Sequence, residues 1–544
     1  MNSVSMRLLS FVCFAAASAA YCEDADVVIN EIFYYPDSDW QQEEFIELYN
    51  RGDESVSLQG WAFSDGVTYI FPEEAWIEAH GYLLLARDAD ALRRLAPGKT
   101  IFGNYEGRLA DSGERLTLYN DEGEIVDTVK YGDSPPWPTR PDGSGSSLER
   151  ISPYVDSSNI ANWASAKENV SSSNWLITPC VRNSVYSENL PPFVDHVSWS
   201  PESPHPHADV TIQAHIMDEE GVDQVQLHYK PVRYRQTAMS EKTVEMQRIS
   251  GGANDGVWSA DVPGQVDRTL VRFWMEAVDA QGVSQIHPAE TEARQTFTYF
   301  HYADEEQSTI PIVFLYDFGG PDNPNALRND SAFVIRRPDG EGWEVYDHIN
   351  TTARTRSGDG YDIRFLKHYE LDDMSSINVI FEPKPRYALS EWLSYQVYHS
   401  LGVMAGNADH YRFIRNDRDY GYYLMFEQPN KHFIARQGLN NEGNLYKLHW
   451  SYDRNTSDRQ ISVLHEKRTN LSSGKEDIIE TVQTLHELSG VEQTLYIETH
   501  FAVDQFINYY VGCQLISDWD GYFNNHFVYH DTEGSGLWYI FPWD

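Results

Sequence analysis

The chain has 544 residues, which is too long for one hydrophobic core and predicts about two to four domains. Hydrophobic residues make up 41% of it and aromatic residues 13%, a composition that excludes wholesale disorder. Its 83 acidic and 41 basic residues give a formal net charge of −42. A field this negative argues against nucleic acid and anionic membranes as partners.

The amino terminus predicts export from the cell. Residues 8–17 form a short apolar run and small residues at 17–19 supply a cleavage site, so residues 1–19 are interpreted as a secretory signal peptide. Processing as a lipoprotein through Cys22 is the alternative, which the neighbouring Tyr21 disfavours. No later segment approaches about 20 uninterrupted apolar residues, so no transmembrane segment is expected. The protein is expected to be secreted, periplasmic or bound at the cell surface.

The four cysteines predict neither a zinc site nor a disulfide framework. Cys13 leaves with the signal peptide, and Cys22, Cys180 and Cys513 are widely spaced. One disulfide, or isolated thiols with Cys513 buried in a helix, are the two alternatives.

Residues 25–150 have the pattern of an antiparallel β-sandwich. Short alternating segments such as "EEFIELYN" and "ERLTLYNDEGEIVDTVKYGD" are separated by turns rich in Gly, Asp and Asn. Together with "INEI", "LQGWAFSD" and "GYLLLA", their order resembles the lamin-tail domain family. The resemblance implies an immunoglobulin-like fold and a role in adhesion or targeting. It extends to "TPCVRNS", where Cys180 replaces the usual glycine.

A segment rich in Ser, Asn and Pro at residues 151–192 is expected to be a linker. The module that follows, residues 193–302, again shows short strand patterns with Asp and Gly turns. It resembles an immunoglobulin-like or fibronectin-type-III domain, which implies a rigid spacer.

Residues 310–544 change from strand patterns to helix patterns, which predicts an α+β domain. "ALSEWLSYQVYHSLG" predicts a helix whose buried stripe contains Leu389, Leu393, Val397 and Leu401. "EDIIETVQTLHELSG" predicts a second helix, and "LYIETHFAVDQFINYYVGCQLIS" a third. The expected fold class is multidomain: two all-β immunoglobulin-like sandwiches followed by an α+β domain. Strands before helices is also the order of an atypical protein-kinase-like domain, an assignment that depends on the family resemblance given below.

The last residues contain a pattern suited to phosphoryl transfer. That reaction needs a carboxylate to orient the acceptor hydroxyl and oxygen ligands for a divalent metal. Kinases supply an Asp, an Asn five residues later and a second Asp after a hairpin, and Asp520, Asn525 and Asp544 follow this order. The alternative for Asp520 and Asn525 is an Asx-type turn. Asp518 competes with Asp520 for the catalytic position.

Four segments of this domain, "DYGYYLMFEQPNKHFIAR", "EGNLYKLHW", "DWDGYFNNHFVYHD" and "WYIFPWD", together resemble the spore-coat CotH kinase-like family. The resemblance implies Asp520 as the base that orients the acceptor, with Asn525 and Asp544 as metal ligands. It also implies that Glu427 and Lys447 serve nucleotide or metal binding.

The sequence departs from that family in two places. Members commonly carry a basic "P-K-K-S-Y" segment, whereas "RTRSGDGYDIRFLKH" stands here and leaves Arg364 and Lys367 as candidate phosphate contacts. Arg does not reproduce the point charge of Lys. Members also continue past the final "PWD" with a further acid and helix, so the domain is expected to be a fragment or shortened at its C-terminus.

The resemblance implies an exported CotH-type atypical kinase. It would transfer a phosphoryl group from ATP, with Mg²⁺ or Mn²⁺, to Ser or Thr of a surface or secreted protein. The acidic chain favours basic or Ser-rich acceptors by electrostatic steering, and the β domains are expected to contact cell wall or polysaccharide. The main alternative is a non-catalytic adhesion or scaffold protein with a degenerate kinase-like domain. A third reading, a secreted hydrolase, lacks an identifiable pair of catalytic acids.

Overall fold

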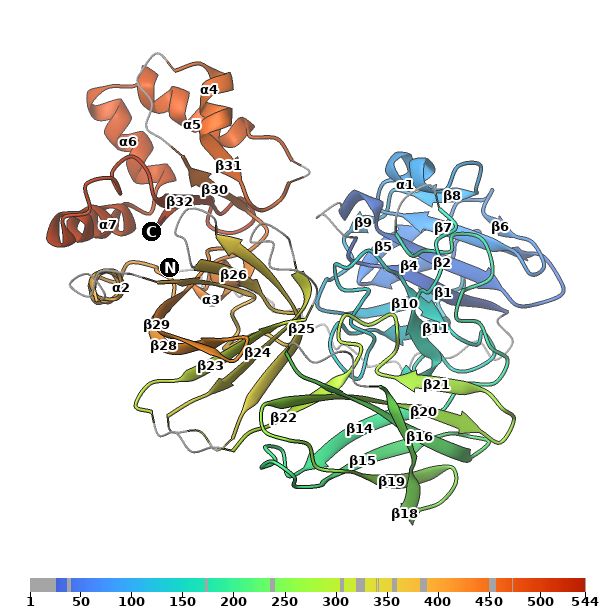
Figure 1. Cartoon of the computed structure of the whole chain (residues 1–544). Helices are drawn as coiled ribbons and strands as arrows, with labels where there is room; N and C mark the ends of the chain where they lie inside the picture. Colours follow the sequence, from blue (N-terminus) through green and yellow to red (C-terminus); the bar gives the residue numbers. More distant parts are fainter. Residues whose placement is uncertain are drawn as a thin grey trace, which may run out of the picture. The chain divides into compact units, whose positions relative to one another are not determined.

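A computed structural model describes residues 26–36, 41–171, 175–234, 240–303, 308–318, 328–338, 340, 342–354, 360–381, 389–449, 456–471 and 473–543. The predicted signal peptide and Asp544 lie outside these residues. The described chain forms two compact units (Figure 1). The first contains the described residues up to Pro36, Gln41–Trp137 and Ser144–Glu188; the second contains Pro138–Gly143 and the described residues from Asn189 onward.

The first unit contains two facing sheets. One has the strand order β13 (Trp163–Ser165), β12 (Leu148–Arg150), β1 (Val27–Phe33), β2 (Phe45–Asn50), β7 (Tyr82–Ala86) and β8 (Ile101–Gly103). The other has the order β11 (Ile125–Lys130), β10 (Arg115–Tyr119), β4 (Ala62–Asp65), β5 (Val67–Ile70) and β9 (Glu106–Gly107). Shorter elements are the strand pair β3 (Val56–Ser57) and β6 (Trp76–Ile77) and the 3₁₀ helices η1 (Gln41–Glu43) and η2 (Ile160–Asn162).

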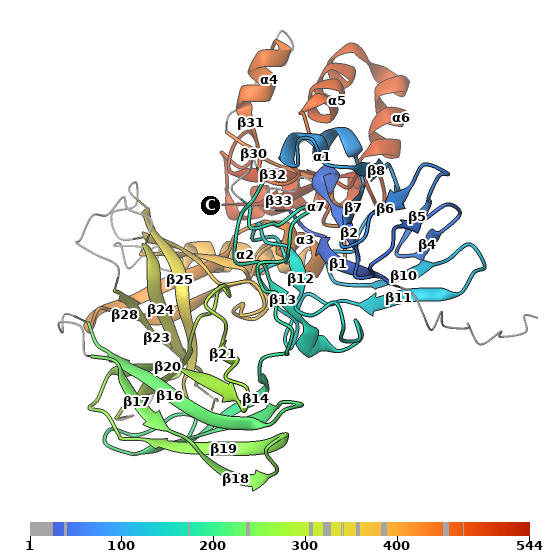
Figure 2. The ribbon, with the colours of Figure 1, turned by 90° about the vertical axis from the view of Figure 1, so that its right-hand side faces the viewer.

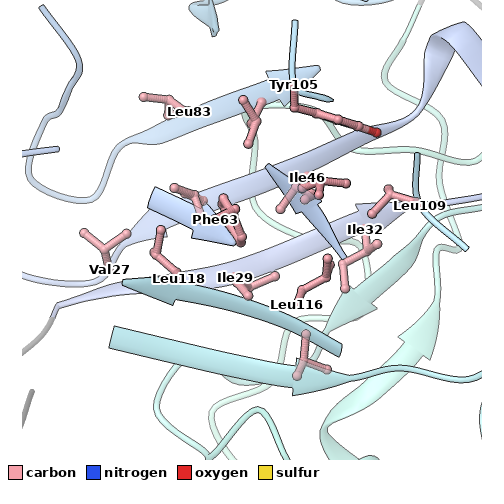
Figure 3. Close-up of a cluster of buried hydrophobic side chains, with 14 of the residues drawn as sticks. Val27, Ile29, Ile32, Ile46, Phe63, Leu83, Tyr105, Leu109, Leu116 and Leu118 are labelled. Carbon is pink, nitrogen blue, oxygen red and sulfur yellow. The ribbon is translucent and has the colours of Figure 1, made fainter. Parts of the chain in front are cut away.

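The core between these two sheets consists of the inward-facing side chains, which are every second residue along a strand. Ile29 and Ile46 come from the first sheet, and Phe63 and Leu118 come from the second (Figure 3). None of them is more than 1% exposed. Burial of such apolar surface, at about 25 cal/mol per Å², is the main stabilising term for this unit.

The outer face of the sheet that contains β1 and β2 is covered too. Phe33 and Phe45 pack there against Leu92 of helix α1 (Ala89–Leu95) and against Ile177. We call residues 175–185 the strap; they lie within the segment expected to be a linker and belong to the first unit. Because both faces are covered, every residue of β1 is buried.

The second unit begins with another pair of sheets. One has the order β14 (Phe193–Ser200), β15 (Val210–Met217), β19 (Asp255–Val262) and β18 (Gln247–Gly251). The other contains β17 (Lys242–Glu245), β16 (Val222–Val232), β20 (Thr269–Asp279) and β21 (Ser284–His287), and β22 (Phe297–His301) also pairs with β20. Figure 2 shows β16 and β20 in one layer and β19 and β18 in the other. Residues from both layers form one hydrophobic cluster.

A closed barrel of seven strands follows. Its order is β23 (Ile312–Asp317), β24 (Arg328–Arg336), β25 (Glu344–Arg354), β26 (Gly360–Arg364), β27 (Ser376–Ile380), β29 (Arg418–Glu427) and β28 (Ala408–Arg415). A parallel pairing of β23 with β28 closes the ring, whereas the other neighbours are antiparallel. Along β23, Val313 and Leu315 belong to one cluster, while Phe314 and Tyr316 belong to another. The period-2 alternation of a strand therefore gives the barrel two apolar surfaces.

The second of these surfaces packs against the preceding sandwich. Leu270 and Phe300 of the sandwich share a buried cluster with Phe314. Beside them, Arg272 donates to both carboxylate oxygens of Asp347, at 2.8 and 2.7 Å, and both residues are buried. The sandwich that the sequence suggested as a spacer is therefore attached to the barrel by a buried interface.

The chain ends in a small sheet with helices around it (Figures 1 and 2). The sheet has the order β31 (His465–Lys467), β30 (Asn444–Leu448), β32 (His526–His530) and β33 (Trp538–Pro542). The helices are α2 (Ser390–Ser400), α3 (Lys431–Arg436), α4 (Asp458–Leu464), α5 (Glu476–Glu487), α6 (Gly490–His500) and α7 (Val503–Ile516). Strands before helices were predicted for this domain. The immunoglobulin-like and kinase-like assignments stay predictions.

Two helix predictions were wrong in detail. In α2 the predicted stripe is not the buried face, because Leu389 and Leu393 are 57% and 49% exposed whereas Tyr395 and Tyr398 are buried. The third predicted helix is two helices, α6 and α7. It is interrupted because Phe501 forms a bridge with Trp538 of β33 and the next residue donates its N–H to the Trp538 oxygen at 2.9 Å.

Candidate functional site

The acidic segment after α7 is anchored by a close contact between two helices. α2 and α7 can approach because Gly512 has no side chain: a Cβ there would lie 2.6 Å from the Tyr398 ring. Tyr398 stacks on Tyr509 with the ring centroids 5.6 Å apart and the planes within 8°. The chain then leaves α7 through Ser517, whose φ of 61° lies in the left-handed region. We call residues 517–525 the acid loop.

Asp518 holds this loop in place. Its Oδ1 accepts the N–H of Gly521 at 3.0 Å, and its Oδ2 accepts the Tyr398 hydroxyl at 3.3 Å. A Cβ at position 521 would lie 2.4 Å from the Asp518 Oδ2, so glycine here lets the Asp518 carboxylate lie close to the backbone. Burial raises the pKa of Asp518, the Gly521 hydrogen bond opposes this, and the nearby Asp520 raises it further. The turn-stabilising role considered for Asp520 is thus performed by Asp518.

Asp520 and Asn525 are in direct contact. The amide of Asn525 donates to Asp520 Oδ2 at 3.0 Å. Asn525 has a φ of 52°, a left-handed conformation that Asn tolerates better than most residues. Its backbone oxygen accepts the N–H of Trp543 at 3.1 Å, which ties the acid loop to the end of β33. Asp544, the other predicted metal ligand, lies outside the described residues, so its role stays a prediction.

Lys447 reaches the same end of the small sheet. It lies on β30, and its Nζ is 5.3 Å from the centroid of the Trp543 ring, a cation–π distance. The Trp543 ring also packs against Phe426 and Phe527, with centroids 5.2 and 5.4 Å away. Trp543 therefore connects Lys447 to the acid loop through its ring and its backbone. Trp543 belongs to the "WYIFPWD" segment, but nothing in the sequence pattern indicated this role.

Glu427 lies directly after Phe426 at the end of β29 and is 1% exposed. Its Oε2 forms an ion pair with Arg436 and accepts the N–H of Asn407 at 3.3 Å, while its Oε1 is buried without a hydrogen-bond partner. Burial raises the pKa of Glu427, and Arg436 opposes that shift. Glu427 lines a cavity of about 60 Å³ together with Asn407 and Asp409. Sequence reasoning missed Arg436, because only the turn into α3 brings it back over β29.

The two remaining predicted cations lie elsewhere on the barrel. Arg364 lies on β26 with its side chain 63% exposed, 3.7 Å from Asp362. Lys367 forms an ion pair with the buried Asp142, which also contacts Nε2 of His368 at 2.7 Å. Neither contact involves another predicted site residue.

The stretch of sequence that contains the acid loop has no permanent positive side chain of its own. From residue 476 to Asp544 the sequence contains no Lys or Arg, while Asp and Glu recur throughout. Positive charge next to the loop therefore comes from earlier in the chain, as with Lys447, or from a bound cation.

Two family models match the chain. Residues 23–133 match the Lamin Tail Domain, and residues 361–544 match the CotH kinase protein family. The chain therefore carries a lamin tail domain near its start and a CotH-family domain at its end, as the resemblances implied.

A curated relative is the inner spore coat protein H of Bacillus subtilis (strain 168), which is 21% identical over 193 residues. The match covers 34% of this chain and 52% of the relative, so the chain spans about half the relative's length. No helix in the described part of the chain is long and apolar enough to cross a membrane.

Similar solved structures include a cycloalternan-forming enzyme from Listeria monocytogenes, at 12% identity over 34% of this chain and 17% of that one, with a TM-score of 0.16. Another is the sporulation control protein Spo0M of Bacillus subtilis, at 8% identity over 36% of this chain and 91% of that one, with a TM-score of 0.15.

Proposed function

We propose that the CotH-family domain is a metal-dependent phosphotransferase that moves the terminal phosphoryl group of ATP to a Ser or Thr hydroxyl of a surface or secreted protein. The observation that carries the proposal is the contact between Asp520 and Asn525 on one loop. Asp518, the competing acid, is already bound to Tyr398 and Gly521. Asp520 is therefore the acid of this loop that we assign to the acceptor hydroxyl.

The oxygen atoms of this region suit a hard divalent cation. Carboxylate and amide oxygens are the ligands that Mg²⁺ and Mn²⁺ prefer. Asn525 uses its amide nitrogen on Asp520, which leaves its amide oxygen for a metal, and Asp544 is the proposed second ligand. A bound ion would neutralise charge on the phosphate oxygens during transfer. That contribution matters here because the chain offers no Lys or Arg after residue 475.

The other proposed contacts are Lys447, which lies against the Trp543 ring, and Glu427, which follows Phe426 on β29. Arg364 is an exposed candidate for a more distant phosphate contact, and Lys367 would first have to leave Asp142. The excess of acidic residues favours a basic or Ser-rich acceptor. Export, and contact of the β domains with cell wall or polysaccharide, belong to the same proposal.

A non-catalytic scaffold is the second candidate. Lys367 and Glu427 are both held in ion pairs with other residues, Asp142 and Arg436. These pairs favour a domain that binds a partner without turning over ATP.

The test is phosphorylation by the purified full chain, including any residues encoded after Asp544, with labelled ATP and Mg²⁺ or Mn²⁺. Asp520→Asn keeps an oxygen that accepts from Asn525 but removes the charge. We expect it to lower label incorporation at least about a hundredfold, as loss of a positioned base does. Asp504→Asn, on an exposed position of α7, is the matched control. Full activity of the Asp520 variant, or no label on the folded wild type, would move the assignment to the scaffold.

A further inference from the structure

Three glutamates lie side by side in the lamin tail domain. Glu31 on β1 pairs in register with Glu149 on β12 and with Glu47 on β2, so the three side chains share one face of the sheet. All three are 0% exposed. We call Glu31, Glu47 and Glu149 the acid trio.

Among the residues that the structure describes, no Lys, Arg or His forms an ion pair with any member of the acid trio. Burial therefore raises the pKa of Glu31 to about 8, with a further contribution from Glu149. Burial also raises the pKa of Glu47 well above its ordinary value, and it raises the pKa of Glu149.

Most of the hydrogen bonds to the trio come from the strap. Glu31 accepts the backbone N–H of Thr178 at 3.0 Å, and the Thr178 hydroxyl donates to Glu149. Glu149 also accepts the Ser184 hydroxyl at 2.7 Å. Glu47 accepts the backbone N–H of Cys180. Outside the strap, the Ser147 hydroxyl bonds Glu31 and the Asn30 amide bonds Glu47.

The strap also supplies the cover that keeps water from the trio. Ile177 is fully buried and Trp175 packs on Phe33 with the ring centroids 5.2 Å apart. Cys180 has a φ of 56°, a left-handed conformation that favours glycine, which fits the glycine usual at this position in the resembling family. The strap therefore completes the bonding of the trio and its burial at once.

The other titratable groups that face the trio do not balance its charge. Tyr82 of β7 and the thiol of Cys180 are acids, and burial raises the pKa of both, that of Cys180 to about 12. Lys99 donates to the backbone oxygen of Cys180 at 3.3 Å rather than to a carboxylate. Arg182 lies over the Tyr186 ring, 4.6 Å from its centroid.

We propose that the strap is a proton-dependent latch, which stays closed while the acid trio holds protons and opens as the pH rises. Opening exposes the carboxyl groups to solvent and returns their pKa to its ordinary value near 4.5, so they release protons. The closed state binds more protons than the open state between pH 4.5 and about 8. Rising pH through that window therefore favours opening. This device is independent of the proposed phosphotransferase.

Cys180 lies on the strap and reports its opening. We would measure the rate at which 4,4′-dithiodipyridine modifies Cys180 in the mature full chain, using peptide mass spectrometry. The wild type is compared with Glu31→Gln, whose amide oxygen can accept from Thr178 N–H and Ser147 while its NH₂ group donates to the Thr178 hydroxyl. The ratio of the two rates at one pH removes the intrinsic pH dependence of the thiol. We expect this ratio to rise roughly tenfold or more from pH 5 to pH 8.5.

Two controls test whether the change in the modification rate is specific to Glu31 and to the strap. Glu122→Gln, on an exposed hairpin turn of the same unit, should leave the rate at Cys180 unchanged, and Cys513 in the second unit should give a constant ratio. If Glu31→Gln does not fold, Glu149→Gln takes its place. A ratio that stays flat from pH 5 to pH 8.5 would overturn the latch.

Discussion

The two units of this protein accommodate buried carboxyl groups in opposite ways. In the first unit, Glu31 lies among other glutamates and neutral donors, and burial raises its pKa to about 8. In the second unit, Asp347 is equally buried, but the charge and hydrogen bonds of Arg272 outweigh burial and lower its pKa to about 2. Burial alone therefore does not decide the charge of a carboxyl group; the charge of its hydrogen-bond donors does. Glu31 and Asp347 should therefore contribute to the free energy of unfolding with opposite dependence on pH.

The largest effect is expected from breaking the pair in the second unit. Arg272→Ala leaves Asp347 buried without a cation, which typically costs about 3–5 kcal/mol. Urea unfolding of the full chain, followed by hydrogen exchange with mass spectrometry so that each unit is resolved, gives the change in unfolding free energy. A loss below about 1 kcal/mol in the second unit would contradict the structural reading.

The acid trio provides the opposite test. Because folded Glu31 keeps a proton that the unfolded chain releases, it should lower the stability of the first unit by about 1.4 kcal/mol per pH unit between pH 4.5 and about 8. The raised pKa values of Glu47 and Glu149 add to this slope, and Glu31→Gln should remove the share of Glu31. Urea unfolding at pH 5, 6.5 and 8 measures it, and a wild-type slope of zero or of the opposite sign would refute the assignment.

A smaller effect of the opposite sign is expected at Asp477, at the start of α5. Burial raises its pKa, but hydrogen bonds from His530, Tyr446 and Asn444 outweigh this and lower it to about 2. Its stabilisation is therefore present above pH 3.8 and lost as the pH falls toward 2. Asp477→Asn should cost about 2 kcal/mol at pH 7. The difference from the wild type should vanish near pH 2; a difference that persists there would assign the cost to packing.

The smallest effect is expected at a surface pair. Arg337 contacts Glu344 and Asp372 at 2.8 Å each, but both acids are nearly half exposed. Arg337→Ala should cost no more than about 1 kcal/mol. It is the matched control for Arg272→Ala, since each guanidinium contacts two acids and only the burial differs. Equal losses of unfolding free energy for Arg272→Ala and Arg337→Ala would contradict the importance of burial.

The sequence predicts local features of this protein better than long-range ones. The alternating segments of residues 25–150 follow from local chemistry, and the family resemblance marked Cys180 as a position usually held by glycine, which its φ of 56° fits. The barrel does not, because its closure pairs Ile312 with Arg412, a contact that no local pattern encodes. The buried face of α2 was also missed. The spacing of the leucines predicts that Leu393 is buried. Tyr398 is buried instead, because its hydroxyl donates a hydrogen bond to Asp518 and its ring stacks on Tyr509.

The candidate site shows the same division. Asp520 and Asn525, five residues apart, are in contact because both lie on one loop, while the catalytic and metal-binding roles that the sequence suggested for them stay predictions. The partners of Glu427 and Lys367 were not predictable. Arg436 pairs with Glu427 because α3 folds back toward β29. Asp142 pairs with Lys367 because residues 138–143 pack with the second unit, although their neighbours in sequence belong to the first.

The parallel pairing of β23 with β28 affects the order in which the barrel can fold. β23 is made early and β28 almost a hundred residues later, so the ring stays open until both β28 and β29 are available. Until then β23 and β27 each present an unpaired edge, which invites pairing with other chains. Contacts of such long sequence separation form slowly. A chain that stops before Arg418 lacks β29 and cannot close the ring, so expression of such a shorter piece should give aggregates instead of a folded domain.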